Sequence, residues 1–369
     1  MRVIVSGGGT AGHINPALSI AKKIKEKEKD SEILFVGTPA GMENRLVEKA
    51  GFPIRHVEVK GFQRKLTLKN IKSAFLAVTS VSKAKKILRE FRPDVVVGTG
   101  GYVCWPVLRA AEKLGVPTLV HEQNAIPGLT VSKLSKFADV VCYSFEGSEK
   151  NFPCKKEKLV LTGNPVGPEV IAAKKDECRR KLGISAPFLL SYGGSLGASA
   201  INEAMFEFAR DYSMKKPIFH THAFGAREWD KWCEKEKEAR ITRFGNVRFR
   251  EYIDDMPRQM AAADLVICRA GAITLAELAV LGKPAVLIPS PNVVNDHQTK
   301  NARLFEEAGA AVLLPEGELS TEKLIGIVSD LLFSPEKLRK MSSAMKKMAK
   351  PDADEKIFAE IAKLTKHRS

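Results

Sequence analysis

Short aliphatic runs alternate with longer stretches of helical periodicity along most of the chain. In the first half, the aliphatic runs predict buried strands at Arg2–Ser6, Ile33–Val36, Val95–Val97, Thr118–Val120 and Val140–Cys142. The stretches between them predict helices near Pro16–Lys27, Glu43–Ala50, Lys69–Arg89, Trp105–Leu114 and Leu129–Lys136. Apolar strands that alternate with helices indicate a parallel sheet covered on both faces.

The second half repeats this pattern after a link rich in glycine and proline, Gly163–Pro168. Strands are predicted near Phe188–Ser191, Ile218–Thr221, Leu265–Ile267, Ala285–Ile288 and Ala311–Leu314. Helices are predicted near Ala198–Arg210, Thr274–Leu281, Thr299–Ala308 and Thr321–Leu332, with a last one near Asp354–Lys366. We therefore predict an α/β fold of two Rossmann-like, doubly wound domains, 1–164 and 165–349, that face a central cleft. The last helix, within about 350–369, is expected to pack on either domain.

Length and composition agree with two packed domains, because the 369 residues are 44% hydrophobic. No apolar run approaches the roughly 20 residues of a spanning helix. The N-terminus runs straight into a glycine loop and lacks the features of a signal peptide. None of the six cysteines forms a Cys-x-x-Cys pair or has histidines at zinc spacing, so we expect reduced thiols. These features favour a cytosolic or membrane-surface protein.

The positive charge is concentrated in the first half. The chain has a formal net charge of +16. Residues 1–164 carry 27 Lys and Arg against 15 Asp and Glu, whereas residues 165–369 carry 32 against 28. An anionic partner is therefore expected to meet the first half.

Three glycine-rich loops follow predicted strands, and they span both halves of the chain. They are Gly7–His13, Gly98–Tyr102 and Gly193–Ala198. The first matches G-x-G-x-x-G, which suits a diphosphate at a helix N-terminus but also occurs as a tight packing turn. A dinucleotide enzyme also needs an acid after the second strand to hold the ribose, and here that strand ends Val36-Gly37-Thr38. Together the loops indicate a site that handles phosphates from both domains.

Seven motifs in a fixed order carry a resemblance to a known family. They are Gly7–His13 with Asn15–Leu18, Gly100–Tyr102, His121–Asn124, Gly163–Val166, Gly193–Ser195, Arg269–Ala272 and Asp296–Ala302. The sequence resembles the MurG family of glycosyltransferase family 28, which transfers GlcNAc from UDP-GlcNAc to undecaprenyl-pyrophosphoryl-MurNAc-pentapeptide in peptidoglycan synthesis. The resemblance covers nearly the whole chain. It implies the GT-B fold, a donor site mainly in the C-terminal domain, an acceptor site in the N-terminal one, and inversion to a β-1,4 product.

An inverting transfer needs a base for the acceptor hydroxyl and stabilisation of the departing UDP. His13, at the start of the first helix, is the first base candidate, because neutral imidazole can take a proton at cytosolic pH. Positioning of the acceptor phosphate, or a simple capping role, are the alternatives. Glu122 is a second catalytic candidate, with a sugar ligand or a solvated loop acid as alternatives. His121 is expected to be structural.

The resemblance also implies the remaining site residues. Those assigned to the donor are Thr10, Ala11, Gly12, Asn124, Ser195, Arg269, Ala272, Ile273, Thr274, Glu277, His297 and Gln298. Those assigned to the acceptor are Gly9, His13, Gly100, Gly101, Tyr102 and Asn124. In the family the acid at position 277 accepts hydrogen bonds from both ribose hydroxyls, whereas a plain helix-dipole role is the alternative.

One residue departs from the family pattern, and one kind of ligand is missing. The family commonly continues Gly-Asn-Pro-Val with Arg, but this chain has Gly167, which removes a guanidinium able to clamp phosphate. No Asp-x-Asp pair presents itself for a diphosphate-bound metal. We therefore expect no cofactor and no obligatory metal, with UDP-GlcNAc as a substrate.

Residues 60–92 combine ten basic residues with one acid, Glu90, and an apolar strip. The residues expected to meet a membrane are Leu66, Leu68, Ile71, Lys72, Phe75 and Leu76. An anionic lipid surface attracts such a segment, whereas a core-facing helix with a solvated basic face is the alternative. Nucleic acid is not expected, because no recognition motif is present. The resemblance places the chain peripherally on the cytoplasmic face of the cell membrane, with cell-wall synthesis proteins as further partners.

Two other functions fit the same fold. One is a second enzyme, either a UDP-sugar epimerase or a different glycolipid transferase; an epimerase acts on the free nucleotide sugar and needs no membrane face. A nucleotide-sugar sensor without chemistry has no need of His13 and Glu122, yet both are present. The basic segment and these two residues favour the transferase.

Overall fold

A computed structural model describes the backbone of residues 1–59 and 68–366, and the side chains of residues 1–59 and 79–366. The chain forms two compact units. Unit 1 comprises Met1–Val166 and Pro351–Ser369, and unit 2 comprises Gly167–Lys350. The chain therefore passes between the units twice, at 166–167 and at 350–351.

Unit 1 is built on a parallel sheet with the strand order β3-β2-β1-β4-β5-β6-β7. Its strands are β1 (Arg2–Ser6), β2 (Glu32–Gly37), β3 (Ile54–His56), β4 (Val95–Gly98), β5 (Thr118–Glu122), β6 (Val140–Tyr143) and β7 (Leu159–Leu161). Its helices are α1 (Ala11–Lys27), α2 (Glu43–Lys49), α3 (Leu68–Phe91), α4 (Cys104–Lys113), α5 (Leu129–Ser135) and α15 (Ala353–Lys366), with 3₁₀ turns at Glu149–Asn151 and Lys156–Lys158. Because all pairings are parallel, the carboxyl ends of the strands meet along one edge.

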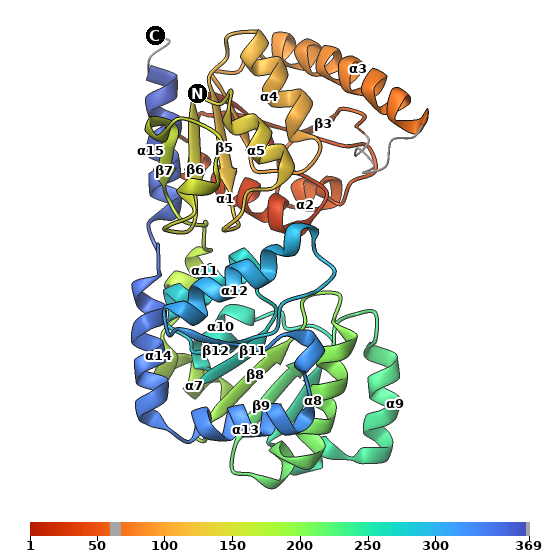
Figure 1. Ribbon diagram of the computed structural model, residues 1–369, viewed down its shortest axis with the longest axis vertical. Helices are drawn as coiled ribbons and strands as arrows, with labels where there is room; N and C mark the ends of the chain where they lie inside the picture. Colours follow the sequence, from red (N-terminus) through yellow and green to blue (C-terminus); the bar gives the residue numbers. More distant parts are fainter. Residues whose placement is uncertain (60–67, 367–369) are drawn as a thin grey trace. The chain divides into compact units, whose positions relative to one another are not determined.

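Two apolar layers hold unit 1 together, one on each face of the sheet. On one face, Val3 and Val5 pack with α1 and with Ile357 and Ile361 of α15. On the other, Ile4 and Val96 pack with α3, α4 and α5. The C-terminal helix thus completes the core of unit 1 although α14 belongs to unit 2 (Figure 1). Lys23 of α1 pairs with Glu355 of α15 at 3.2 Å at the border of this contact.

Unit 2 repeats the architecture with the strand order β10-β9-β8-β11-β12-β13, again all parallel. Its strands are β8 (Phe188–Tyr192), β9 (Phe219–Ala223), β10 (Val247–Arg250), β11 (Leu265–Cys268), β12 (Ala285–Leu287) and β13 (Ala311–Leu313). Its helices are α6 (Pro168–Ile171), α7 (Lys175–Leu182), α8 (Ser199–Asp211), α9 (Trp229–Ala239), α10 (Met256–Ala262), α11 (Ala272–Leu281), α12 (His297–Glu307), α13 (Thr321–Leu332) and α14 (Pro335–Lys347), with 3₁₀ turns at Ser213–Lys215, Ile241–Phe244, Val294–Asp296 and Glu316–Glu318.

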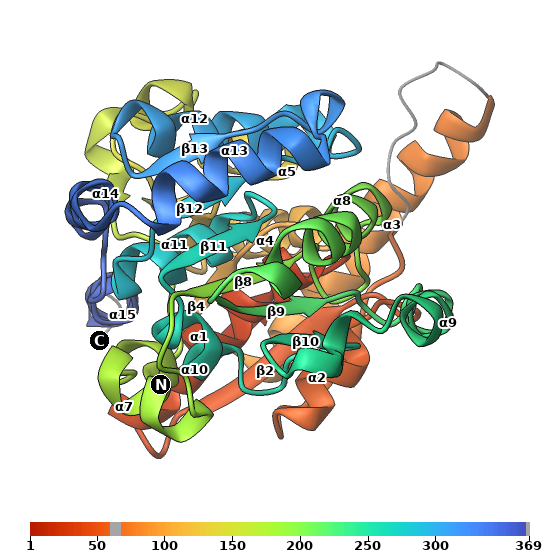
Figure 2. The ribbon, with the colours of Figure 1, turned by 90° about the horizontal axis from the view of Figure 1, so that it is seen from below.

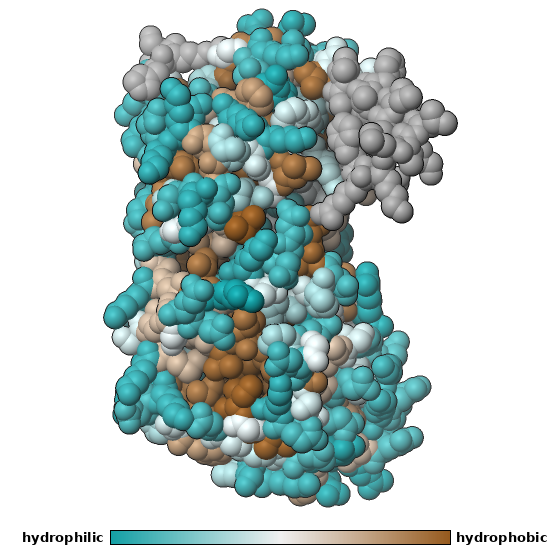
Figure 3. All heavy atoms as spheres, in the orientation of Figure 1, coloured by the Kyte–Doolittle hydropathy of each residue, from teal (hydrophilic) through white to brown (hydrophobic). Residues whose placement is uncertain are grey.

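Helices cover both faces of the second sheet. Figure 2 shows α8 and α13 on one side of the sheet and α7 and α10 on the other. Leu189, Ile267 and Val286 of the strands pack against Met205 of α8 and Leu324 of α13. Hydrophilic side chains cover most of the outer surface on the face that Figure 3 shows, as expected for helices that turn an apolar stripe to a sheet. The two-sheet α/β fold is confirmed.

The sequence pattern missed some elements and misplaced others. Strands β3, β7 and β10 were not predicted, and each lies at the edge of its sheet, where a strand is not buried on both faces. Helices α6, α7, α9, α10 and α14 were also missed. The first helix begins at Ala11 rather than Pro16, so the first glycine loop runs directly into it.

Candidate active site

At the carboxyl edge of the first sheet, two glycine loops lie backbone to backbone. The Gly8 N–H donates to the Gly100 carbonyl at 3.3 Å. Gly101 has a φ of +87°, and a Cβ there would clash with the Gly8 carbonyl. Only glycine meets both demands. The structure therefore brings together the two loops that the sequence assigned to the acceptor, and Tyr102 lies exposed beside them.

His13 lies in the first turn of α1, held by contacts on three sides. Its Nδ1 is 3.1 Å from the Gly8 carbonyl oxygen and 3.2 Å from Thr10 Oγ1. A Cβ on Gly100 would lie 2.7 Å from the imidazole Cδ2, so the ring packs on that glycine. The Thr99 hydroxyl donates to the His13 carbonyl at 2.7 Å. Since a carbonyl oxygen only accepts, the contact with Gly8 assigns the ring proton to Nδ1 and the basic lone pair to Nε2.

Glu122 is buried, with an exposed fraction of 2%, and both carboxylate oxygens bind the loop that follows it. Oε1 accepts from the Asn124 N–H at 2.9 Å and from its side-chain amide at 3.1 Å. Oε2 accepts from the Gly128 N–H at 3.0 Å. Burial raises the pKa of Glu122, while these hydrogen bonds oppose the rise. In this geometry Glu122 holds the loop in place, and its catalytic part stays a prediction.

His121 and the link after β7 form one buried polar cluster in unit 1. His121 is fully buried, and burial lowers its pKa to about 4. Its Nε2 lies 3.0 Å from the Gly163 carbonyl, and its Nδ1 lies 2.9 Å from the Gln123 side-chain nitrogen. The Asn164 side chain donates to the Gln123 carbonyl at 3.0 Å. His121 is therefore structural, and the first residues of the predicted link are fixed within unit 1.

Glu43, the first residue of α2, is a site residue that was not predicted from the sequence. Its exposed fraction is 1%, and Oε1 accepts from the N–H and the hydroxyl of Thr38 at 2.9 and 2.8 Å. Oε2 accepts from the Gly9 N–H at 3.2 Å. Burial raises the pKa of Glu43, but the hydrogen bonds from Thr38 and Gly9 outweigh it and hold the pKa below its usual range. An ionised carboxylate thus lies under the first glycine loop.

In unit 2, a pocket of about 470 Å³ opens at the carboxyl ends of β8, β11, β12 and β13. Its lining is mostly polar and comprises Gly193, Gly197, Ala198, Ser199, Ala200, Arg227, Arg269, Ser290, Asn292, Gln298 and Glu316. The N-terminus of α8 opens into it and carries no acid in its first turn. Free N–H groups, a helix dipole and two arginines make this pocket suited to a diphosphate.

Arg269 and Gln298, both predicted for the donor, line this pocket. The Arg269 guanidinium donates to the carbonyls of Ile288 and Pro289 at 3.1 and 3.0 Å and pairs with Glu316. The Gln298 carbonyl oxygen accepts from the Ser290 N–H at 2.9 Å, which directs its amide nitrogen to act as a donor. These contacts fix both side chains in one wall of the pocket.

The segment before α12 has an unusual backbone. Asn295 and Asp296 adopt φ values of +58° and +51°, a region that Asn and Asp tolerate better than other side chains. The Asp296 carboxylate accepts from the Thr299 hydroxyl at 2.6 Å, and His297 Nδ1 lies 2.9 Å from the Val294 carbonyl. Such conformations concentrate at ligand sites. The sugar-contacting role expected for His297 stays a prediction.

The other predicted donor residues of unit 2 lie outside the lining of this pocket. Ser195 is exposed at the tip of the third loop, whereas Ser199, four residues later, lines the pocket. Ala272, Ile273 and Thr274 form the first turn of α11, and Glu277 lies in the second turn, which excludes a first-turn role. Burial, together with the charge of Glu169, raises the pKa of Glu277 to about 7.

A hydrogen-bond network supports the third loop, and it is buried except at its Ser199 and Glu228 end. The Ser199 hydroxyl donates to Glu228, which also accepts from the Asn202 amide at 2.8 Å. The Asn202 carbonyl oxygen lies 3.3 Å from His222 Nε2, and Ser191 bridges His222 and His220 at 2.8 and 2.9 Å. Burial lowers the pKa of His220 to about 3. Both histidines are therefore neutral structural groups.

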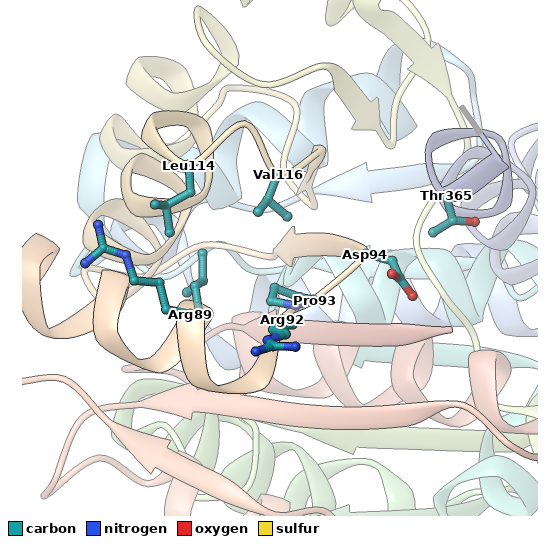
Figure 4. Close-up of a pocket in the computed structure, with 8 residues that line it drawn as sticks. Arg89, Arg92, Pro93, Asp94, Leu114, Val116 and Thr365 are labelled. Carbon is teal, nitrogen blue, oxygen red and sulfur yellow. The ribbon is translucent and has the colours of Figure 1, made fainter. Parts of the chain in front are cut away.

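A second pocket lies at the opposite edge of the first sheet. It has a volume of about 720 Å³, and Figure 4 shows Arg89, Arg92 and Asp94 along it. Residues 92–94 precede β4 and residues 114–116 precede β5, so the pocket lies at the amino ends of these strands. It is separate from the glycine loops and is not part of the candidate site.

The predicted membrane residues, Leu66, Leu68, Ile71, Lys72, Phe75 and Leu76, lie outside the described side chains. In the described half of α3, Ala84, Ile87 and Leu88 are buried against the sheet, which matches the alternative of a core-facing helix there. Within the described part of the chain, no helix has the length and apolarity to span a bilayer. The same residues contain no group of three or more His, Cys, Asp or Glu that could hold a metal ion.

The match to known families identifies the class of protein, a glycosyltransferase. The N-terminal domain of glycosyltransferase family 28 matches residues 3–143, and its C-terminal domain matches residues 188–357. The chain therefore belongs to this family.

Among its relatives is the UDP-N-acetylglucosamine–N-acetylmuramyl-(pentapeptide) pyrophosphoryl-undecaprenol N-acetylglucosamine transferase of Thermoanaerobacter sp. (strain X514). It is 46% identical, and the alignment covers 99% of this chain and 100% of the relative. The crystal structure of Acinetobacter baumannii MurG matches with a TM-score of 0.78 and 31% identity, over 98% of this chain and 99% of that one. A UDP-GlcNAc 2-epimerase of Neisseria meningitidis shares the fold, with a TM-score of 0.67 at 15% identity over 98% of this chain and 100% of that one.

Proposed function

We propose that this protein transfers GlcNAc from UDP-GlcNAc to the MurNAc 4-hydroxyl of undecaprenyl-pyrophosphoryl-MurNAc-pentapeptide. The observation that carries the proposal is the full-length relationship to transferases named for this reaction, at 46% identity. The arrangement of the site supports it, because each unit carries glycine loops at the carboxyl edge of its sheet. The edge in unit 1 suits the acceptor, and the edge in unit 2 suits the donor.

In the mechanism we propose, His13 is the general base. Its Nδ1 proton is held by the Gly8 carbonyl, so Nε2 can take the proton from the acceptor hydroxyl. The acceptor oxygen then attacks the anomeric carbon from the side opposite UDP, which gives a β product from an α donor. The proton moves to Nε2 as the C–O bond to UDP breaks and the new C–O bond forms.

The departing diphosphate is stabilised by the pocket of unit 2. The N-terminus of α8 and the guanidinium of Arg269 supply the positive potential that the developing charge needs. Glu277 binds the ribose hydroxyls, as the resemblance implies. We also propose that no metal ion is required, since this pocket neutralises phosphate with N–H groups and arginines.

The acceptor is lipid-linked, so we propose that the protein works at the cytoplasmic face of the cell membrane. The cluster of basic and apolar residues in 60–92 supports this placement. Cell-wall synthesis proteins are proposed as further partners. Vesicles rich in anionic lipid should retain the protein and neutral vesicles should not, and equal retention by both would contradict this placement.

The direct test combines UDP-GlcNAc with a short-chain analogue of the lipid-linked acceptor. We expect UDP release and a β-linked disaccharide, at a rate that EDTA does not change. The same incubation without acceptor distinguishes the epimerase, because only an epimerase converts free UDP-GlcNAc to its 2-epimer. Epimer formation, or no disaccharide from a protein that binds UDP-GlcNAc, would contradict the proposed function.

A further inference from the structure

A single peptide group connects Glu43 with His13. The peptide between Gly8 and Gly9 uses both of its polar groups at once. Its N–H, on Gly9, donates to Glu43 Oε2 at 3.2 Å. Its carbonyl, on Gly8, accepts from His13 Nδ1 at 3.1 Å. The carboxylate, the peptide group and the imidazole therefore form a continuous chain of hydrogen bonds.

The surroundings of Glu43 are shaped to hold its carboxylate in this position. A Cβ on Gly8 would lie 2.9 Å from Glu43 Oε1, and a Cβ on Gly37 would lie 2.7 Å from its Cγ. A Cβ on Gly41 would overlap the carboxylate itself. Thr38 binds Oε1 twice, so Oε2 is left to Gly9. Three glycines from two segments thus make room for one buried acid.

We propose that Glu43 is a positioning residue for the catalytic base, acting on His13 through the Gly8–Gly9 peptide. A carboxylate on the N–H side polarises the peptide group and increases the negative charge on its carbonyl oxygen. That oxygen then holds the Nδ1 proton more strongly, which fixes the tautomer and raises the basicity of Nε2. The arrangement does for His13 what a directly bonded carboxylate does in a Ser-His-Asp triad, with one peptide group in between.

The charges around the pair are consistent with this role. Cys104 of α4 lies near both glycine loops, and its thiol contacts the Ser6 and Gly100 carbonyls as a donor. Burial raises the pKa of Cys104 to about 11, so this thiol is neutral at cytosolic pH. Glu43, whose pKa is held below its usual range, brings a negative charge to the N–H side of the Gly8–Gly9 peptide.

The proposal rests on the proposed function only for its kinetic consequence. Its geometric part is measurable without substrate, by ¹⁵N NMR of the seven histidines and of the Gly9 amide. We expect the neutral His13 to carry its proton on Nδ1, and the Gly9 amide proton to resonate far downfield. Glu43→Gln should move the Gly9 resonance upfield and shift the His13 ¹⁵N signals. A wild-type His13 protonated on Nε2 would overturn the proposal, whether or not the protein transfers GlcNAc.

The kinetic test uses the pH profile. We expect Glu43→Gln to lower kcat about tenfold, less than the 10²- to 10⁴-fold effect typical of a general base itself. The acid limb of the kcat profile should move to lower pH, because a less basic imidazole is protonated later. The KM for UDP-GlcNAc should stay unchanged. If Glu43→Gln only loosens the loop, kcat falls but the acid limb of its pH profile stays where it is. That outcome would also overturn the proposal.

Glu236 offers a matched control in unit 2. It accepts from the Thr242 N–H and hydroxyl at 2.8 and 2.7 Å and from the Ile241 N–H at 3.2 Å, the same pattern as Glu43. Glu236→Gln should leave the limb and the His13 signals unchanged. Should Glu43→Gln fail to fold, Glu43→Asp keeps the charge but withdraws it from Gly9. An unchanged Gly9 resonance in that variant would contradict the proposed contact.

Discussion

The two glycine-rich edges have the same scaffold, but different side chains surround their loops. In unit 1, a buried carboxylate, Glu43, binds the first loop from within, and a histidine follows it on α1. In unit 2, the third loop opens on a pocket with two arginines, and its supporting histidines are fully buried. Both sheets are parallel, and both loops lie at carboxyl ends. The difference therefore comes from a few side chains rather than from topology.

In the function that we propose, this contrast lets one fold serve two substrates. A base needs a neutral or negative environment, which favours removal of a proton from the acceptor. A leaving diphosphate needs a positive environment. Unit 2 supplies helix N-termini that have no acid in their first turns. Variants in unit 1 should therefore change the rate of chemistry, whereas variants in unit 2 should change donor affinity.

His13→Ala should have the largest effect of these variants. The effect should fall on the chemical step and not on the binding of UDP. We expect kcat to fall by about 10²- to 10⁴-fold, the usual contribution of general-base catalysis, while the affinity for UDP stays within error of the wild type. Steady-state kinetics and calorimetric UDP titration measure the two quantities. His56→Ala, which removes an exposed histidine of β3, is the control. A turnover close to normal would end the assignment of His13 as the base.

The contrast between the edges was only partly predictable from the sequence. The glycine loops could be placed because each follows an aliphatic run that predicts a central, fully buried strand. The edge strands β3 and β10 were missed because Ile54–His56 and Val247–Arg250 contain charged or polar residues. The edge strand β7 was missed although it is apolar, whereas β13, which is also an edge strand, was predicted from its apolar run.

The supporting side chains were harder to predict than the loops. Glu43 opens a helix, and an acid at that place ordinarily complements the helix dipole. Only the folded chain shows that Gly8, Gly37 and Gly41 surround it. The cluster of glycines near one acid, Gly37 and Gly41 before Glu43, is the signal that could have found it. Ser199 and Arg227 were missed because they come together with Arg269 only through the order of the strands.

Glu277 should make donor binding depend on pH. Burial and the charge of Glu169 raise its pKa to about 7, so it is protonated below that pH and ionised above it. The ionised form can accept a charge-assisted hydrogen bond at each carboxylate oxygen, whereas protonation turns one oxygen into a donor and weakens acceptance from two ribose hydroxyls. The affinity for UDP-GlcNAc should therefore rise about tenfold from pH 6 to pH 8, as the ionised fraction grows from about 0.1 to about 0.9.

Two variants sharpen the test of Glu277. Glu277→Gln should bind UDP-GlcNAc more weakly and with no pH dependence in this range. Glu169→Gln removes the neighbouring charge, so the rise in affinity should move to lower pH. If the wild-type affinity is flat between pH 6 and pH 8, Glu277 does not bind the donor as an ionised acid.

Arg227→Ala should give the smallest effect of these variants, and it should separate most clearly the role of the unit 2 edge from that of the unit 1 edge. It lines the pocket of unit 2 but is exposed, so solvent screens its attraction for a phosphate. Arg227→Ala should weaken UDP binding about fivefold, as expected for an interaction of about 1 kcal/mol. This loss should shrink as salt is added. Arg243→Ala, an exposed arginine of unit 2 outside the pocket lining, is the control for net charge. Because Arg227 is expected to bind the donor, kcat at saturating donor should stay unchanged. A fall in kcat of the same size would contradict the separate roles proposed for the two edges.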